Sequence, residues 1–167
     1  MGNALMQNME SYNSAVRNLP SGLDAVPPGF IGRLMMIDDN EVDHMLVHRT
    51  VKKSGLVGEY LTYTWAEEAL AALRQGLEVD AILLDVNMPQ MDGFEFLAAA
   101  RAEFGLDQMP VVALMLTTEL SGTALDTAQC EPAITTQIAK PLRIDALAGL
   151  GREVARRQEE RLAVGEG

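Results

Sequence analysis

The strongest indication of the fold is the segment at residues 82–93, which reads Ile82-Leu83-Leu84-Asp85-Val86-Asn87-Met88-Pro89-Gln90-Met91-Asp92-Gly93. It starts with apolar residues typical of a buried strand and then meets a carboxylate at Asp85. A loop punctuated by Pro89 and Gly93 leads into helical sequence. Asp85 is therefore predicted at the carboxyl end of a strand, where open α/β sheets bind ligands. A carboxylate there is unfavourable unless a metal ion or a cation neutralises it.

Strand patterns and helical patterns alternate on both sides of this stretch. The strands are predicted at residues 34–37, 60–64, 81–84, 111–116 and 134–139, and the helices at about 40–54, 65–75, 94–104, 121–129 and 144–162. This alternation is typical of βαβ units, so we expect a parallel sheet with helices on both faces. The helix at 121–129 is expected to be short, because it contains a glycine and two threonines. In the first helix, Val42, Met45, Leu46 and Val51 are expected to face inward.

Length and charge limit the possible functions. A chain of 167 residues fits one domain with extensions, here a flexible leader at 1–32, a domain at 33–155, and a helix end and tail at 156–167. The net charge of −11 argues against binding to nucleic acid or to anionic membranes. No apolar run is long enough for membrane insertion, and no secretory signal is present. The single cysteine excludes a disulfide within the chain and suits a cytoplasmic location.

Polar side chains follow four of the predicted strands. They are Asp38, Asp39, Asp85, Thr117, Thr118 and Lys140. In a parallel sheet these strand ends meet at one edge, so the side chains are expected to converge there. Clustered carboxylates repel one another unless a cation joins them, and Mg²⁺ prefers such oxygen ligands. With Lys140 to bind a phosphoryl oxygen, Asp85 can act as a phosphoryl acceptor.

Four motifs together resemble the receiver domains of two-component response regulators, over about residues 33–152. They are Met36-Ile37-Asp38-Asp39-Asn40, the stretch from Leu83 to Gly93, Leu116-Thr117-Thr118 and Ala139-Lys140-Pro141. The resemblance implies a flavodoxin-like, doubly wound sheet of five parallel strands in the order 2-1-3-4-5.

The resemblance also implies a role for each matching residue. Asp85 is expected to be the phosphoacceptor and to bind Mg²⁺ together with Asp39 and the backbone carbonyl of Asn87. Asp38 is expected to bind the ion directly or through water. Thr117 corresponds to the switch hydroxyl.

Lys140 corresponds to the phosphate-binding lysine, and a cis peptide bond is expected before Pro141. The residues expected to modulate the phosphoryl lifetime or the switch are Asn87, Thr118, Glu119 and Gln137.

Two further features of the sequence bear on this interpretation. Gln137 stands where the family usually carries the aromatic residue that reports phosphorylation, so the usual coupling between hydroxyl and aromatic ring is in question. His44 and His48 lie four residues apart, a spacing that can bind zinc. We interpret them instead as part of a solvated helix face.

The resulting expectation is a single-domain response regulator rather than an enzyme. It would accept a phosphoryl group from a histidine kinase or a histidine phosphotransfer protein. It would then signal through its fourth-helix to fifth-helix face, with a homodimer as one possibility, or pass the phosphoryl group on. The alternative is an interaction module that works without phosphorylation. An aspartyl-nucleophile hydrolase is disfavoured, because Asn87 stands where such enzymes carry a second aspartate.

Overall fold

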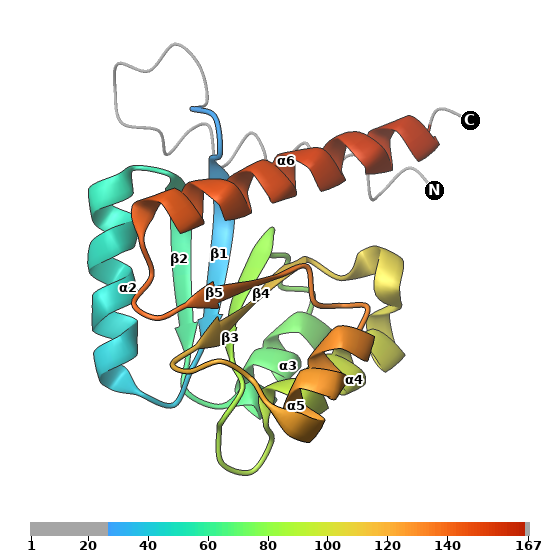
Figure 1. Cartoon of the computed structure of the whole chain (residues 1–167). Helices are drawn as coiled ribbons and strands as arrows, with labels where there is room; N and C mark the ends of the chain where they lie inside the picture. Colours follow the sequence, from blue (N-terminus) through green and yellow to red (C-terminus); the bar gives the residue numbers. More distant parts are fainter. Residues whose placement is uncertain (1–26, 166–167) are drawn as a thin grey trace.

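Five parallel strands form the centre of the protein (Figure 1). The structure is a computed structural model, and it describes residues 27–165. The strands are β1 (Ile31–Ile37), β2 (Val57–Tyr63), β3 (Ala81–Asp85), β4 (Val111–Leu116) and β5 (Thr136–Ala139). Their order in the sheet is β2-β1-β3-β4-β5, all parallel (Figure 1). The predicted five-stranded doubly wound fold is thus confirmed. Most of the predicted leader, residues 1–26, lies outside the described residues.

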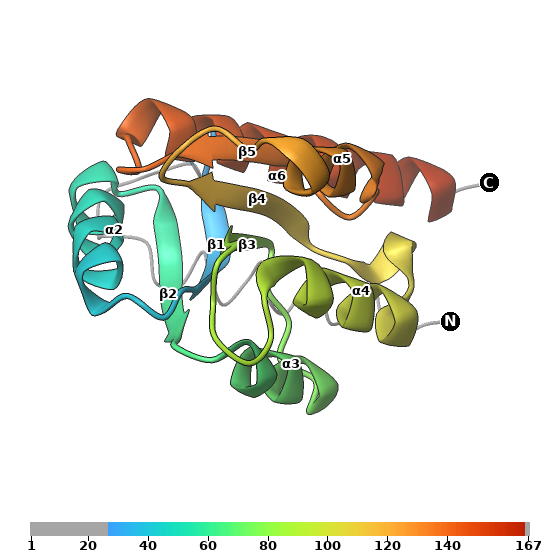
Figure 2. The ribbon, with the colours of Figure 1, turned by 60° about the horizontal axis from the view of Figure 1, so that its bottom comes forward.

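Helices cover both faces of the sheet (Figure 2). On one face lie α2 (Glu41–Ser54) and α6 (Ile144–Gly165), and on the other α3 (Ala66–Arg74), α4 (Gly93–Phe104) and α5 (Gly122–Cys130). A short 3-10 helix, η1 (Leu106–Gln108), leads from α4 to β4. This three-layer arrangement covers both faces of the sheet, whereas the carboxyl ends of its strands remain at an edge where loops and ligands can meet.

The two faces of the sheet make two separate hydrophobic cores, because neighbouring side chains in a strand point in opposite directions. In β1, Leu34 and Met36 pack with α2 and α6, whereas Met35 and Ile37 pack with α3 and α4. All of these side chains are buried. Strands that are apolar on both faces explain the continuous apolar runs in the sequence.

The expected inner face of the first helix is wrong for three of its four residues. Val42, Met45 and Leu46 are 61%, 66% and 41% exposed, whereas Val47 and Val51 are buried in the core under α2. Val47 and Val51 are one turn apart and set the face of α2 that meets the sheet. The polar residue Asp43 shares this face and points toward β5, which turns Val42 and Met45 outward.

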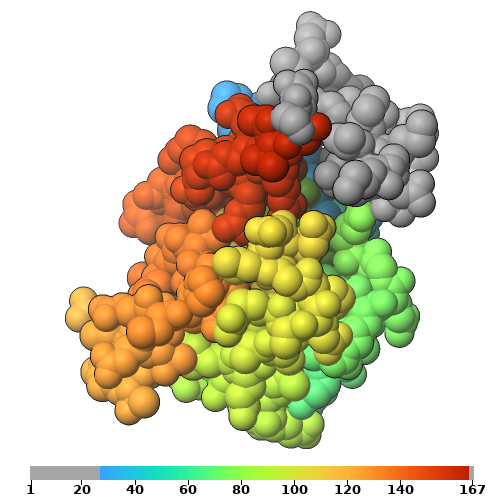
Figure 3. Space-filling model, turned by 90° about the vertical axis from the view of Figure 1, so that its right-hand side faces the viewer, coloured from blue at the N-terminus to red at the C-terminus, as the bar shows by residue number. Residues whose placement is uncertain are grey.

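The segment after β4, expected to be a short or mobile helix, forms the nine-residue helix α5. Within α5 only Ala128 is buried, so little apolar surface holds this helix to the domain. Residues of α5 and its flanking loops project from the body of the domain in Figure 3, where they are orange. The lone cysteine, Cys130, ends α5 and is exposed.

The strand boundaries differ from the predicted ones mainly at their starts. β1 begins at Ile31, because the pairing of Ile31 with Val57 extends the ladder three residues before Leu34. β5 begins only at Thr136, since the Ile134 amide donates to the Glu131 carbonyl in a turn. Such turn hydrogen bonds leave no clear signature in the hydrophobic pattern.

Candidate functional site

The carboxylate of Asp38 is fixed at the end of β1. Its backbone amide donates to the Tyr63 carbonyl, and its side-chain Oδ1 accepts from the Asn40 amide at 2.9 Å. Asp38 is completely buried, while the next residue, Asp39, is exposed. Asn40 in turn caps α2, accepting from the Val42 amide at 2.9 Å. The turn between β1 and α2 therefore directs one carboxylate inward and leaves the next at the rim.

Asp85 ends β3 and is 8% exposed. The loop after it returns at once to the strand end, where the Gly93 amide donates to the Val86 carbonyl. A Cβ atom on Gly93 would lie 2.6 Å from the Asp85 carbonyl oxygen, so only glycine allows α4 to start this close. Asp92 and Glu95 form a capping box at the same helix end. Gly93 therefore allows the start of α4 to pack directly against the backbone of Asp85.

Asp38, Asp39 and Asp85 form the acidic cluster of this site. Each offers a carboxylate oxygen, and these oxygens all lie within 4.8 Å of one another. Hard divalent cations such as Mg²⁺ are bound by oxygen ligands in this kind of arrangement, usually with water completing the shell. The residues predicted from the sequence to hold the ion are therefore brought together, and Asn87 follows at an exposed position two residues after Asp85.

Lys140 reaches the acidic cluster from the end of β5. Its Nζ atom lies 2.8 Å from Asp38 Oδ2 and 3.3 Å from Asp85 Oδ1, and its side chain is only 10% exposed. The peptide bond between Lys140 and Pro141 is cis, as the resemblance implied. The lysine thus supplies one positive charge against three carboxylates of the cluster.

Negative charge is in excess in this site, and the pKa values of Asp85 and Lys140 are both raised. Burial, followed by the negative charge of Asp38, raises the pKa of the Asp85 carboxyl to about 6, although Lys140 acts in the opposite direction. Burial alone would lower the pKa of Lys140, but hydrogen bonds to Asp38 and Asp43 raise it above its usual value. An additional cation would relieve this excess of negative charge.

The residues predicted to modulate the site lie around its rim. Thr117, Thr118 and Glu119 follow β4 directly and are all exposed. Within residues 27–165 the Thr117 hydroxyl makes no hydrogen bond, so it is available to a ligand. Gln137 lies on β5 and is also exposed.

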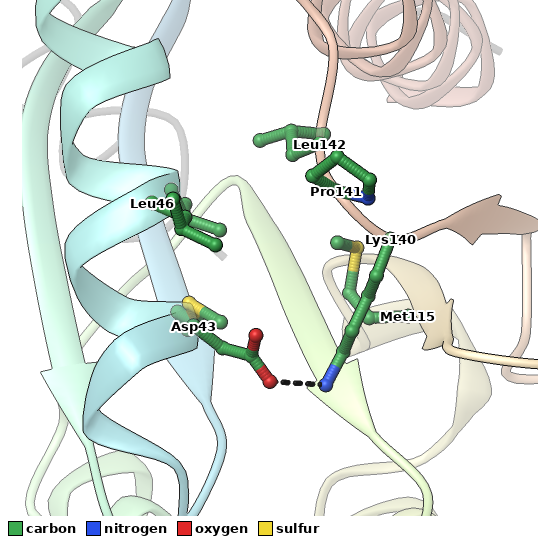
Figure 4. A pocket seen from close by; sticks show the side chains of 8 residues that line it. Asp43, Leu46, Met115, Lys140, Pro141 and Leu142 are labelled. Carbon is green, nitrogen blue, oxygen red and sulfur yellow. Dashed lines mark hydrogen bonds and ion pairs between the residues drawn. The ribbon is translucent and has the colours of Figure 1, made fainter.

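Two neighbours of the site were missed or misread from the sequence. Asp43, in the first turn of α2, places Oδ2 at 2.8 Å from the Lys140 Nζ atom (Figure 4). Its acidic side chain near a helix start suggested nothing beyond helix stabilisation. His44 does not lie on a solvated face as expected, because its Nε2 atom contacts the Asp38 carbonyl oxygen and its Nδ1 atom is buried without a partner. His48 is exposed and packs against Tyr60.

Comparison with known proteins places this fold and site in a class. Residues 34–150 match the family model described as response regulator receiver domain. This match covers more than half of the chain, and the chain therefore belongs to the response regulator receiver family. A protein of this class signals in two-component systems.

Individual relatives agree with this assignment. The chain is 28% identical over 109 residues to a chemotaxis protein CheY homolog of Campylobacter jejuni, matching 65% of this chain and 81% of that protein. It is 31% identical over 106 residues to the sensor histidine kinase CheAY of Helicobacter pylori, covering 63% of this chain. It spans only 12% of that kinase, 5% of the hybrid signal transduction histidine kinase L of Dictyostelium discoideum and 11% of the sensory/regulatory protein RpfC of Xanthomonas campestris.

Solved structures show the same architecture. The chemotaxis response regulator CheY4 of Vibrio cholerae superposes with a TM-score of 0.57 at 28% identity, covering 73% of this chain and 97% of that one. A two-component response regulator from Cytophaga hutchinsonii, at 22% identity, superposes with a TM-score of 0.67 over 74% of this chain and 96% of that one. As for membrane association, none of the helices between residues 27 and 165 has the length and apolar character to cross a bilayer.

Proposed function

We propose that this receiver domain accepts a phosphoryl group on Asp85 and signals by changing its contacts with a partner protein. The observation that carries this proposal is the meeting of Asp85 with Asp38 and Asp39 within 4.8 Å, with the Lys140 ammonium 3.3 Å from the Asp85 carboxylate. Phosphoryl transfer depends on such positioning and charge neutralisation more than on proton transfer.

The step is a nucleophilic substitution at phosphorus. One oxygen of the Asp85 carboxylate attacks the phosphorus of a phosphohistidine, the bond from phosphorus to the imidazole nitrogen breaks, and the imidazole leaves with the electron pair and takes up a proton. The product is an acyl phosphate on Asp85. Asp38, Asp39, the Asp85 carboxylate and the Asn87 carbonyl would hold Mg²⁺, which, when bound, neutralises charge on the transferred group.

The other site residues would act on the product. Lys140 is close enough to Asp85 to donate to a phosphoryl oxygen, and the free Thr117 hydroxyl can donate to another. Asn87, Thr118 and Glu119 stand at the rim, where they would control the approach of water to the acyl phosphate.

The donor is proposed to be a histidine kinase or a histidine phosphotransfer protein. The relatives named as histidine kinases carry a segment similar to this chain, which supports such a donor. The proposed location is the cytoplasm, consistent with the single cysteine. Signalling through the face formed by α5, β5 and α6, with a homodimer as one form of it, or onward phosphotransfer, would provide the output.

The test is phosphorylation by acetyl phosphate in the presence of Mg²⁺, measured by intact mass. Wild type should gain the mass of one phosphoryl group, and this gain should disappear in Asp85→Asn and when the metal is chelated. Asp126→Asn, which removes an equal charge from the exposed surface of α5, is the matched control and should behave as wild type.

Beryllofluoride, which mimics a phosphoryl group on a carboxylate, would be tested on the same samples. Failure of both reagents with wild type would overturn the proposal. It would favour the alternative, an interaction module that works without phosphorylation, for which the exposed, non-aromatic Gln137 on β5 is the supporting observation.

A further inference from the structure

A fourth carboxylate, outside the acidic cluster, holds the site lysine from a different element. Asp43 lies in the first turn of α2, and its Oδ2 atom is 2.8 Å from the Lys140 Nζ atom. This distance equals that between Lys140 and the cluster residue Asp38. Figure 4 shows the Asp43 carboxylate and the Lys140 ammonium facing each other across the gap between α2 and the end of β5.

The hydrogen bonds of the ammonium group are all in use. A lysine ammonium has three N–H donors. The acceptors around Lys140 are Asp38, Asp43 and Asp85. A phosphoryl oxygen on Asp85 can therefore receive a hydrogen bond from Lys140 only if one of these bonds is given up or shared.

Of the three carboxylates, Asp43 can lose its contact with Lys140 at the smallest cost in free energy. Its side chain is 23% exposed, compared with 1% for Asp38 and 11% for Asp85, so water can replace the lysine as its partner. Asp43 also contributes no oxygen to the group that can hold a metal ion. Loss of the lysine from buried Asp38 would leave a desolvated carboxylate unpaired, which is far less favourable.

The surroundings strengthen this ion pair. A small pocket borders the pair and is lined otherwise by apolar side chains and the Pro141 ring, namely Met36, Leu46, Val47, Met115, Pro141 and Leu142. Charges that face such a surface are screened less than charges in open water. The contact between Asp43 and Lys140 therefore holds the ammonium toward α2 in the resting protein.

We propose that Asp43 is a positioning residue that restrains the Lys140 ammonium and so weakens its interaction with a phosphoryl group on Asp85. This inference rests on the proposed function of Asp85 and extends it to a residue that touches neither the phosphoryl group nor a metal ligand oxygen. Phosphorylation would then draw Lys140 away from α2, so the first turn of α2 would lose its tie to β5.

The test compares Asp43→Asn with a matched control, Glu41→Gln. Both lose one negative charge from the first turn of α2, but only Asp43 contacts Lys140. Beryllofluoride binding in the presence of Mg²⁺ would be followed by ¹⁹F NMR. Asp43→Asn should reach half-saturation at a roughly three- to tenfold lower concentration than wild type, since one competing acceptor and one repelling charge are removed. Asp43→Glu, which restores the charge, should return the midpoint toward that of wild type.

A second measurement follows the lysine itself. The chain has three lysines, and the other two, Lys52 and Lys53, are exposed in the last turn of α2, so the Lys140 ammonium signal is readily assigned in ¹⁵N spectra. Hydrogen exchange of this ammonium with water should be faster in Asp43→Asn than in wild type and unchanged in Glu41→Gln. A role in helix stability alone would change the melting temperature without changing this exchange.

The outcomes separate the two proposals. If wild type binds beryllofluoride and Asp43→Asn has the same or a higher midpoint, or matches Glu41→Gln, the positioning role of Asp43 is overturned while the proposed function stands. If no variant binds beryllofluoride or accepts a phosphoryl group, the proposed function fails and the inference fails with it.

Discussion

The Nζ atom of Lys140 lies 2.8 Å from Oδ2 of Asp38, although 102 positions separate the two residues in the sequence. Their strands are not neighbours, because β3 and β4 lie between β1 and β5 in the sheet. The long lysine side chain spans this distance over the carboxyl ends of the strands and passes beside Asp85 on the way. One ion pair thus joins both sides of the sheet across the candidate phosphoacceptor.

The raised pKa of Asp85 predicts a pH-dependent gain in stability for Asp85→Asn. In the folded protein this pKa is about 6, against 3.8 for the ordinary carboxyl, so between these values the folded state binds more protons than the unfolded state. The contribution of Asp85 to the free energy of unfolding of wild type therefore falls as the pH rises through the folded-state pKa of about 6. In metal-free buffer Asp85→Asn should be more stable than wild type by about 1–2 kcal/mol near neutral pH. This gain is smaller than the full shift in the Asp85 pKa implies, because the variant also loses the charge contact with Lys140.

Urea denaturation of both proteins at about pH 7.5 and about pH 5 measures this difference. The advantage of Asp85→Asn should shrink at the lower pH, where Asp85 of the folded wild type is largely protonated. An advantage that is absent or independent of pH would contradict the electrostatic account of the site. Asp126→Asn again serves as the control for removal of one negative charge.

Mg²⁺ should stabilise the folded protein through the acidic cluster. A ligand present at a hundredfold excess over its dissociation constant stabilises by about 2.7 kcal/mol, provided that it binds only the folded state. Asp39→Asn should lose most of this gain, because it removes one of the three carboxylate ligands, whereas Glu68→Gln on the exposed surface of α3 should retain it. Melting temperatures with and without Mg²⁺ provide the measurement, and an equal gain in both variants would place the ion elsewhere.

Substitution of two glycines of α6 by alanine should change the stability of the fold in opposite directions. A Cβ on Gly151 would lie 1.7 Å from the Gly29 carbonyl oxygen, whereas the nearest atom to a Cβ on Gly149 would be a flexible arginine nitrogen 3.6 Å away. Gly151→Ala should therefore destabilise the fold by about 2–4 kcal/mol, as the chain before β1 must move. Gly149→Ala should stabilise it by about 0.5–1 kcal/mol through helix propensity. The denaturant midpoints of the two variants, compared with that of wild type, test both expectations.

The observed orientation of α2 predicts unequal effects of truncation. Val47→Ala removes buried methyl groups and should destabilise the fold by about 1.5–3 kcal/mol. Met45→Ala, on the exposed side of the same helix, should change stability by less than about 0.5 kcal/mol. Urea denaturation measures both losses, and a loss in Met45→Ala as large as that in Val47→Ala would contradict the observed orientation of α2.

The order of strands and helices, and the residues at the carboxyl ends of the strands, could be predicted from the sequence. These features are local: apolar runs specify buried strands, and glycine, proline and capping residues mark where they end. Because parallel strands place their carboxyl ends at one edge, the convergence of Asp38, Asp85 and Lys140 follows from the strand pattern alone. The motifs around these residues also indicated the family.

The surroundings of that edge depend on how distant elements pack together. The face of α2 could not be read from its sequence, since Val42 and Met45 are as apolar as Val47 and only packing against the sheet selects among them. For the same reason the contact between Asp43 and Lys140 was not foreseen. It depends on the position of α2 relative to β5, which many distant side chains set together and no short segment encodes.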